Sequence, residues 1–503
     1  MRISGFSSGL DIDQIVKDLM KAKRVPLDKL TQQKTTLEWQ REQFRDINIK
    51  LVDFRNNKLF NYGLEGSINA KQVNITGNTT AVSAKATSSA VAGTITVEVD
   101  ALATAASVRS SNGGGIGAVD TSQTLSALKG AGTINYTADG SGNVTFTVNG
   151  ASITLNETTD TLASMAAAIN GNSTANANAF VDSETGKMSI TSKTTGAGNI
   201  TFAGDLLDNF DMTVSTAGTD ANVIINGIAT TRKTNTFTEN GVEITLNAAG
   251  GAEASLNVVS NTDKIVDTIK SFIKDYNDVF DSVNNKINEE RDRKYPPLTA
   301  DQRADMKEDE IRLWEEKAKS GLLRNDSTLS KLISDARLAS ITSVTVGGTQ
   351  VELASLGIVT GTWEQRGKLV IQDEAKLRAA IEADPDQVMK FFTQPTAETD
   401  PTLKVLPTNP DNGLFNRLTN VVMTALDELA TKAGTIKYST DINAAFLPTS
   451  NIGEKLTSID SRVADLNRRL SLIETRYFKQ FTAMEVAMNK YNAQAGSLFG
   501  ASN

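Results

Sequence analysis

Residues 452–477 read IGEKLTSIDSRVADLNRRLSLIETRY, and their apolar side chains recur at alternating steps of four and three. This spacing is typical of a coiled-coil seam, which must pack on a partner helix. The seam residues are Ile452, Leu456, Ile459, Val463, Leu466, Leu470, Ile473 and Tyr477. The step after Tyr477 is again four, a stutter that locally unwinds a left-handed supercoil. The stripe then resumes with Phe481, Met484, Met488 and Tyr491.

The amino-terminal end has a comparable pattern. Asp11 and Gln14 have the spacing of a capping box, which predicts a helix to about Ala22. Pro26 suits the first turn of a second helix, which we expect to run to about Leu59. The apolar residues of these two helices are Leu10, Ile12, Ile15, Val16, Leu19, Leu30, Leu37, Phe44, Ile47, Leu51 and Phe54. Both ends of the chain are therefore predicted to associate through helical seams.

Between these ends, alternating Thr, Ser, Asn, Ala and Val predict strands with one buried face. Residues 147–156 and 238–247 match closely, and each is predicted to be a hairpin because Asn-Gly tolerates the positive φ angles of a type I′ turn. A third Asn-Gly occupies residues 226–227. A helix over 161–170 is expected to pack on one of the sheets. The glycine-rich residues 112–117 lack the lysine and the strand-to-helix setting of a phosphate-binding loop, so we interpret them as a flexible loop.

Helical spacing returns after Asp263. We expect a long helix with the stripe Ile265 to Val283, a charged helix over 306–319, a helix from Asp326 or Ser327 to Leu338, short helices at Asp373 and Asp384, and a last amphipathic helix from Leu414 to about Gly434. A small hairpin is predicted over 344–351.

The predicted fold class is α+β and multidomain, with coiled-coil terminal helices, a helical-bundle leg and inserted antiparallel β-rich head domains. The expected division is 1–42 plus 455–503 for the terminal coiled coil, 43–70 plus 262–454 for the leg, 71–115 plus 200–261 for a β-rich head domain, and 116–199 for an inserted β-rich head domain. A chain of 503 residues is long enough for several cores.

Composition removes most catalytic chemistry. The chain has no Cys and no His, which excludes disulfides, Cys nucleophiles, Ser-His-Asp triads and ordinary zinc or haem sites. We therefore expect no catalytic residue, no cofactor and no metal. A net charge of −8 without a basic face argues against nucleic acid as a partner. Neither a transmembrane run nor a signal peptide is recognisable, and the plain reading is cytosolic. Absence of Cys also fits export in an unfolded state by a route other than general secretion.

Several stretches in different parts of the chain resemble one protein family. They are residues 8–27 near the amino terminus, residues 222–227 with Asn235 and 241–246, residues 321–328 and 367–373 with Leu377, Pro385, Val388 and Phe391, and finally Tyr477, Gln480, Phe481, Met484, Glu485 and Met488. The first stretch is similar to the amino-terminal signature of the flagellar filament capping proteins, also called flagellar hook-associated protein 2 or the FliD family. The second is similar to a motif shared by flagellins and hook-associated proteins, and the others resemble the carboxyl-terminal domain of the capping family.

The resemblance implies a homo-oligomeric ring of about five subunits at the distal end of the flagellum, which promotes flagellin polymerisation and prevents loss of exported flagellin. It also implies contacts with flagellin and hook-filament junction proteins, an export chaperone that binds the carboxyl-terminal segment, and secretion by the flagellar type III apparatus without a cleaved signal peptide. The expected location is the extracellular flagellum tip, without membrane insertion or nucleic acid. On this reading the helical seams form the assembly interface, and its candidate residues are Leu10, Ile15, Leu19, Leu30, Leu37, Phe44, Leu51, Leu456, Ile459, Val463, Leu466, Leu470, Ile473, Tyr477, Phe481, Met484 and Met488.

Three other interpretations compete with this one. The seams could be buried inside one subunit, because apolar stripes are more often core than partner surface. Carboxylates such as Asp205, Asp208 and Asp211, or Asp384 and Asp386, could serve glycoside hydrolysis, although acids at these spacings are normally caps and turns. A β head on a coiled-coil stalk also describes an adhesin, but an adhesin is expected to carry a general secretory address or a membrane anchor.

Overall fold

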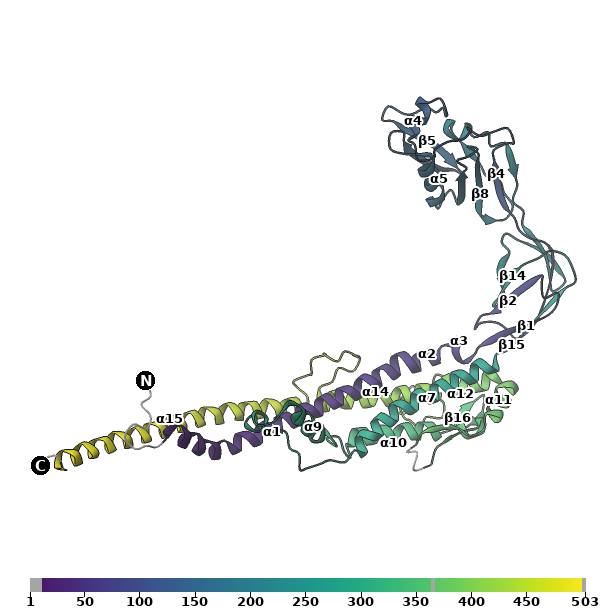
Figure 1. Cartoon of the computed structure of the whole chain (residues 1–503). Helices are drawn as coiled ribbons and strands as arrows, with labels where there is room; N and C mark the ends of the chain where they lie inside the picture. Colours follow the sequence, from purple (N-terminus) through teal and green to yellow (C-terminus); the bar gives the residue numbers. More distant parts are fainter. Residues whose placement is uncertain (1–10, 363–366, 500–503) are drawn as a thin grey trace. The chain divides into compact units, whose positions relative to one another are not determined.

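The computed structural model describes residues 11–362 and 367–499. The chain divides into two compact units: a helical unit, formed by residues 1–68 and 262–503, and a β-rich unit, formed by residues 69–261. Figure 1 shows the long helices of the first and the sheets of the second. The predicted α+β class, with long terminal helices and an inserted β-rich part, is confirmed.

The helical unit is built from long helices joined by short elements. Its helices are α1 (Ile12–Asp53), η1 (Phe54–Leu59), α2 (Phe60–Gly63), α3 (Glu65–Ile68), α7 (Thr262–Asn288), α8 (Ala300–Ala304), α9 (Glu308–Lys319), α10 (Ser327–Ile341), η2 (Leu353–Leu356), α11 (Glu374–Ala383), α12 (Pro385–Thr393), α13 (Pro401–Lys404), α14 (Leu414–Ala433) and α15 (Asn451–Phe499). Its strands form two small hairpins, β16 (Val344–Val346) with β17 (Thr349–Val351) and β18 (Ile358–Thr360) with β19 (Leu369–Ile371).

The predicted helix starts and stops are mostly confirmed. The Asp11 carboxylate accepts the backbone N–H of Gln14 at 2.9 Å, and Asp326, Asp373 and Asp384 cap α10, α11 and α12 in the same way. Gly434 ends α14 with a φ of 80°, a left-handed conformation that glycine adopts without a steric penalty.

The predicted break between two amino-terminal helices is wrong, because α1 continues through Pro26. Proline cannot donate to the carbonyl one turn earlier, which normally ends or bends a helix. Here residues 21–26 are all exposed, so water can satisfy that carbonyl. Met20 and Leu30, on either side of the proline, are both buried, and α1 packs on α15. Tertiary packing therefore keeps the helix continuous, and Figure 1 shows its purple start bent relative to the rest.

The π-helical segment η1 follows α1 without interruption. A π turn accommodates one residue more than an α turn does. Phe54 at its start and Leu59 at its end are buried, whereas Asn56 and Asn57 between them are exposed. The Phe54 ring meets Phe280 of α7 edge-on, with the ring centroids 6.0 Å apart. The extra residue therefore lies on the solvent side, and the segment is held by the core of the helical unit.

Aromatic side chains fill that core. Phe272 of α7 lies 4.8 Å from Phe415 of α14 and 6.1 Å from Phe392 of α12, measured between ring centroids. A buried guanidinium stands next to this apolar core: Arg417 of α14 donates to the carbonyl of Thr342 at 2.9 Å, just past the end of α10. Burial lowers the pKa of Arg417 to about 10. The cation therefore satisfies a carbonyl at a helix carboxyl terminus, where positive charge is favoured.

The β-rich unit contains strands and three short helices. The strands are β1 (Lys71–Gly77), β2 (Val82–Ala86), β3 (Gly93–Ala101), β4 (Ala105–Arg109), β5 (Asn143–Val148), β6 (Ala151–Asn156), β7 (Ala177–Val181), β8 (Met188–Thr195), β9 (Phe202–Ala203), β10 (Val214–Thr216), β11 (Ala221–Ile225), β12 (Ile228–Arg232), β13 (Thr236–Glu239), β14 (Val242–Leu246) and β15 (Ala254–Ser260). The helices are α4 (Leu125–Gly130), α5 (Leu162–Gly171) and α6 (Asp205–Asp208).

All paired strands of this unit are antiparallel. Among the described residues the sheets have the orders β1-β15-β3-β11-β12, β13-β14-β2, β10-β4-β8-β7 and β6-β5-β9. The two predicted Asn-Gly hairpins are confirmed as β5-β6 and β13-β14, and the third Asn-Gly joins β11 to β12 in the same way. At each turn both residues have positive φ, for example 49° at Asn149 and 79° at Gly150, which is the geometry of a type I′ turn.

Two separate apolar cores stabilise the β-rich unit. The first gathers residues of 81–103 and 221–258, and the second gathers residues of 106–212, including the buried face of α5. The described chain thus passes from one core to the other between Ala103 and Ala106 and returns between Met212 and Ala221. The four-part division with borders at 115/116 and 199/200 stays a prediction.

Asparagine side chains tie distant backbone segments of this unit together. The Asn235 amide accepts the N–H of Ala103 at 2.7 Å and donates to the Ala103 carbonyl at 2.9 Å, so it pairs with that residue as a strand would. Asn209 pairs with the backbone of Asn135 in the same way, and Asn170 pairs with Ala179 on the edge strand β7. These amides satisfy backbone groups that the sheets leave open.

Replacing Asn235 by Asp removes the donor to the Ala103 carbonyl and places a carboxylate against it. We expect Asn235→Asp to lower the free energy of unfolding of the β-rich unit by about 1–3 kcal/mol. Urea unfolding and hydrogen exchange at the Ala103 amide measure this. Asn257→Asp is the matched control, because Asn257 is exposed on β15. Equal effects of the two substitutions would contradict the stabilising role of the pairing between the Asn235 side chain and Ala103.

Tyr136 makes the β-rich unit sensitive to alkali. Its hydroxyl donates to Glu157 at 3.0 Å, and burial, then this hydrogen bond, raise the pKa of Tyr136 to about 12. The unfolded phenol titrates near 10, so the stabilisation is complete below about pH 10 and is lost as the pH rises toward 12. Tyr136→Phe should therefore lose less stability than the wild type between pH 10 and pH 12. Thermal midpoints at pH 8, 10 and 11 test this, and parallel curves would refute it.

Candidate assembly interface

The two terminal helices pair within one chain and run antiparallel. Lys34 of α1 donates its ammonium to the Asp460 carboxylate at 2.7 Å, whereas the start of α1 packs near Leu470 and beyond. The apolar cluster at that end contains Ile12, Val16, Met20 and Leu470, with Leu27, Ile473, Tyr477, Phe478 and Phe481 packed against it. Part of the predicted seam is therefore an intramolecular interface.

The predicted interface residues fall into three groups. Those that are buried are Leu30, Phe44, Leu51, Leu456, Ile459 and Leu470. Those that are half-buried are Ile15, Leu37, Val463, Leu466, Ile473, Tyr477 and Phe481. Those that are exposed are Leu19, Met484 and Met488. Leu10 lies outside the described residues. Their role in contacts between subunits stays a prediction.

At the start of α1 the buried face differs from the predicted one. Ile12, Val16 and Met20 point into the cluster, whereas Leu19 is 40% exposed. Leu19 is seven residues from Ile12 and lies only about 20° from it around the helix, so spacing alone does not separate it from this series. The sequence analysis missed Met20 as a seam residue, because Met20 and Leu19 both fit the helical spacing from Ile12 and Val16.

Charge adds little to this pairing. The hydrogen bond to Asp460 raises the pKa of Lys34, but both partners are partly exposed. Such surface pairs contribute about 0–1 kcal/mol. Burial, and then the nearby Asp301 of α8, raise the pKa of Asp28 on α1. The apolar contacts therefore hold α1 on α15.

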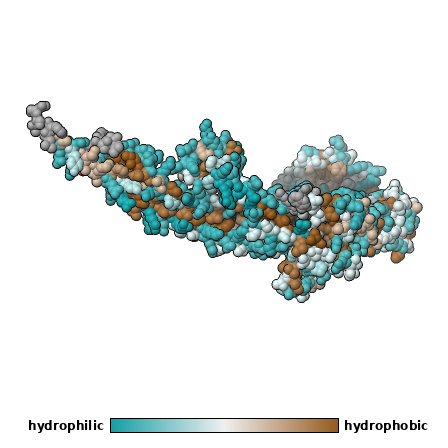
Figure 2. Space-filling view, turned by 90° about the horizontal axis from the view of Figure 1, so that it is seen from below, coloured by the Kyte–Doolittle hydropathy of each residue, from teal (hydrophilic) through white to brown (hydrophobic). Residues whose placement is uncertain are grey.

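The last part of α15 extends past the cluster. Phe481 is the last residue of α15 that packs against it, and among the described residues the helix continues to Phe499, which adds about 27 Å. Met484, Met488 and Tyr491 are 40%, 41% and 70% exposed. Figure 2 shows hydrophobic side chains in a line along the long helices of the helical unit. We call residues 482–495 of α15 the distal segment.

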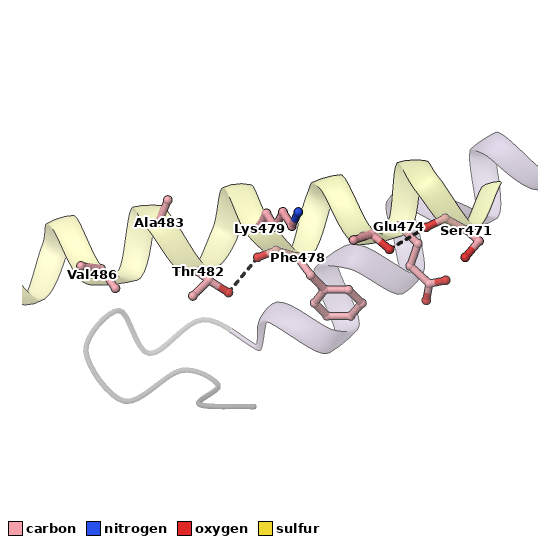
Figure 3. A pocket seen from close by; sticks show the side chains of 8 residues that line it. Ser471, Glu474, Phe478, Lys479, Thr482, Ala483 and Val486 are labelled. Carbon is pink, nitrogen blue, oxygen red and sulfur yellow. Dashed lines mark hydrogen bonds between the residues drawn. The ribbon is translucent and has the colours of Figure 1, made fainter. Parts of the chain in front are cut away.

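A shallow groove lies on another face of α15. It has a volume of about 690 Å³ and is lined by Ser471, Glu474, Thr475, Phe478, Lys479, Thr482, Ala483 and Val486. Figure 3 shows the Phe478 ring pointing toward the ribbon of α1, while Thr482, Ala483 and Val486 belong to the distal segment. Most of the lining side chains are small, which leaves the groove open to a larger side chain.

Three of the five carboxylates considered for catalysis have structural partners. Asp205 accepts the Thr137 hydroxyl, Asp211 accepts the Ser111 hydroxyl, and Asp384 caps α12. In the part of the chain that the structure describes, no three acidic side chains are grouped as a metal site would need. Within the same residues, no helix combines the length and the apolar character needed to cross a membrane.

Comparison with known proteins agrees with this architecture. Residues 218–493 match the family model of the flagellar hook-associated protein 2 carboxyl terminus, and residues 8–106 match that of its amino terminus. Flagellar hook-associated protein 2 of Halalkalibacterium halodurans is 31% identical, over 99% of each chain, and that of Thermotoga maritima is 25% identical over 54% of this chain and 39% of its own. The crystal structure of the D1-D2-D3 domains of the Escherichia coli flagellar cap protein FliD has the same fold, with a TM-score of 0.53 at 18% identity, over 83% of this chain and 99% of that one.

Paired terminal helices with an inserted β-rich unit therefore define a structural protein of the bacterial flagellum. The chain belongs to the flagellar hook-associated protein 2 family. Its function is that of a filament-capping protein, and the adhesin alternative is not favoured.

The seam predicts that two leucines of α15 contribute very differently to the stability of the α1–α15 pair. Leu470 is 8% exposed and packs on α1, whereas Leu472 is 68% exposed. Leu470→Ala should destabilise the α1–α15 pair by about 2–3 kcal/mol, and Leu472→Ala by less than about 0.5 kcal/mol. Hydrogen exchange along α1 and α15 reports the difference. Similar protection in the two variants would mean that α1 and α15 do not pack as described.

Proposed function

We propose that the chain caps the distal end of the filament as a homo-oligomeric ring of about five subunits, and that it directs flagellin polymerisation while it prevents loss of exported flagellin. The observation that carries this proposal is the distal segment of α15, which extends past the apolar cluster with Met484 and Met488 exposed. Burying such side chains contributes about 25 cal/mol per Å², so they favour contact with another subunit or with flagellin.

The β-rich unit is proposed to form the plate of the ring. Its exposed strand positions include Asn74 and Thr76 on β1 and Thr236 and Thr238 on β13. Contacts between such surfaces are polar and modest, which suits subunits that must shift each time a flagellin enters the filament. Hook-filament junction proteins are the proposed neighbours at the start of filament growth.

Export by the flagellar type III apparatus is the proposed secretion route, without a cleaved signal peptide. A chain without Cys cannot form wrong disulfides during passage in an unfolded state. The carboxyl-terminal end of α15 is the proposed site for an export chaperone, because its exposed apolar residues need cover before assembly. The extracellular flagellum tip is the proposed final location.

Two truncations test the role of α15. Deleting residues 455–503 should abolish capping, because it removes the partner of α1 and the distal segment together, while the β-rich unit stays folded. Filament length and flagellin released into the medium measure capping, and circular dichroism of the purified variant checks the fold.

Truncation after Thr482 separates the two contributions, because the helix then still reaches Phe481, the end of the apolar cluster. We expect this shorter protein to keep the α1–α15 pair but to release flagellin. Filaments of normal length from the larger deletion would reject the proposed function.

A further inference from the structure

Asparagine is followed by glycine at six places in the chain, and the surroundings of these six pairs differ. The pairs begin at Asn112, Asn149, Asn170, Asn226, Asn240 and Asn412. An Asn-Gly pair loses its side-chain amide readily, because glycine has no side chain to keep its backbone nitrogen away from the preceding amide carbon. The six pairs share this chemistry, so differences between them in the folded chain come from the fold.

Three of the pairs have a side-chain amide that is held by distant backbone groups. Asn149 donates to one backbone carbonyl at 2.8 Å and accepts a backbone N–H at 3.0 Å. Asn226 accepts the N–H of Thr96 at 2.9 Å, and Asn170 pairs with both backbone groups of Ala179. These amides cannot turn toward the following nitrogen without breaking hydrogen bonds.

Two further pairs are held through their backbone. The N–H of Gly413 donates to the Gln394 carbonyl at 2.8 Å, so this nitrogen is already engaged. The carbonyls of Asn240 and Gly241 accept three hydrogen bonds from residues 87–91. A five-membered ring forms between the side chain and the next nitrogen only if the peptide after the asparagine rotates. The hydrogen bonds of the 240–241 turn oppose that rotation.

Asn112 lacks these restraints. It is exposed, and its side-chain amide makes no hydrogen bond with any residue that the structure describes. Beyond the chain neighbours of Gly113, no described atom lies within 4 Å of the place that a Cβ on this glycine would occupy. The turn is closed by a hydrogen bond from the N–H of Gly114 to the Ser111 carbonyl, at 3.2 Å. The peptide after Asn112 therefore has the space to rotate.

A lysine contacts the peptide bond that has to react. Lys187 is half-buried, and its ammonium donates to the Asn112 carbonyl at 2.9 Å. That carbonyl and the Gly113 nitrogen belong to the same amide, so the cation stabilises the negative charge that forms when the nitrogen loses its proton. The deprotonated nitrogen is the nucleophile, and Lys187 therefore favours its formation.

We propose that Asn112 is a self-modification site, at which the chain converts its own asparagine to an acid. The Gly113 nitrogen bonds to Cγ of Asn112, and the bond from Cγ to Nδ2 breaks. Ammonia leaves with the proton that the nitrogen has lost, and a succinimide ring remains. Water then adds to either ring carbonyl and opens the ring to aspartate or isoaspartate. No electrons are transferred, and water is the co-reactant.

Either product changes an exposed surface of the β-rich unit. Both place a new carboxylate close to Lys187, and isoaspartate also adds one methylene group to the backbone. The chain that follows is bound to the turn between β7 and β8, where the N–H of Ile116 donates to the Gly186 carbonyl at 3.1 Å. A longer backbone at residue 112 displaces this contact. The reaction needs no second subunit, so it does not depend on the capping role.

Asn170 is the matched comparison within the same unit. Lys193 donates its ammonium to the Asn170 carbonyl, as Lys187 does at Asn112. The two pairs thus have the same dipeptide and the same cation, and they differ in the side-chain amide, which Ala179 holds at Asn170. We expect Asn170 to keep its amide.

Peptide mapping by mass spectrometry tests the proposal on the full, folded chain. After incubation at mildly alkaline pH, digestion in acid stops the reaction, and the acid fraction is measured at each of the six pairs. Asn112 should convert while the other five stay amides. In urea all six should convert at similar rates, because the protection comes from the fold. If Asn112 stays an amide, or if another pair converts as fast in the folded chain, the proposal is overturned.

Lys187→Met tests the role of the ammonium. It should slow the conversion of Asn112 in the folded chain by about three- to tenfold and have no effect in urea. Lys187→Arg, which keeps the charge, should restore most of the rate, and Lys193→Met is the matched control, which should leave Asn112 unaffected. Circular dichroism checks the fold of each variant. Equal rates in the folded wild type and in Lys187→Met would overturn the role of Lys187.

Discussion

The packing of α1 on α15 brings the two ends of the helical unit together. It joins residues more than 400 positions apart, as between Lys34 and Asp460. The chain between these residues therefore begins and ends at the same pair of helices. The β-rich unit repeats this principle at its own entrance, where β1 pairs with β15 from Lys71 to Ser260. In each unit, the chain therefore enters and leaves through two elements that pair with each other, α1 with α15 and β1 with β15. Loss of the apolar contacts on α15 would separate the two ends of the chain, since exposed ion pairs contribute too little to replace them.

Sequence reasoning succeeded where the cause of the structure is local. The Asn-Gly turns, the aspartate caps and the Gly434 stop depend on the sterics and hydrogen bonds of a few adjacent residues, and each was found where it was predicted. It failed at Pro26, because the contacts that keep α1 continuous come from α15. The buried face at the start of α1 was partly missed for the same reason, since only the partner helix distinguishes Met20 from Leu19.

The asparagine side chains that pair with distant backbone segments could not be predicted from the sequence. Asn235 belongs to a stretch that resembles a motif of flagellins and hook-associated proteins, but the resemblance does not say why an amide is needed. The structure supplies the reason: only an amide offers both the acceptor and the donor that Ala103 requires, 132 residues away in sequence. The chain has no disulfides, and such paired hydrogen bonds help to hold distant segments in register.

The π-helical segment has a consequence for the direction in which the coiled coil faces. Because η1 contains one residue beyond the α-helical count, every residue before it is turned by about 100° and displaced by about 1.5 Å relative to an uninterrupted α-helix. Ile12, Val16 and Met20 therefore meet α15 in an orientation that is set more than thirty residues away, where Phe54 and Leu59 are anchored in the leg. One inserted residue thus sets the angle at which the start of α1 faces α15.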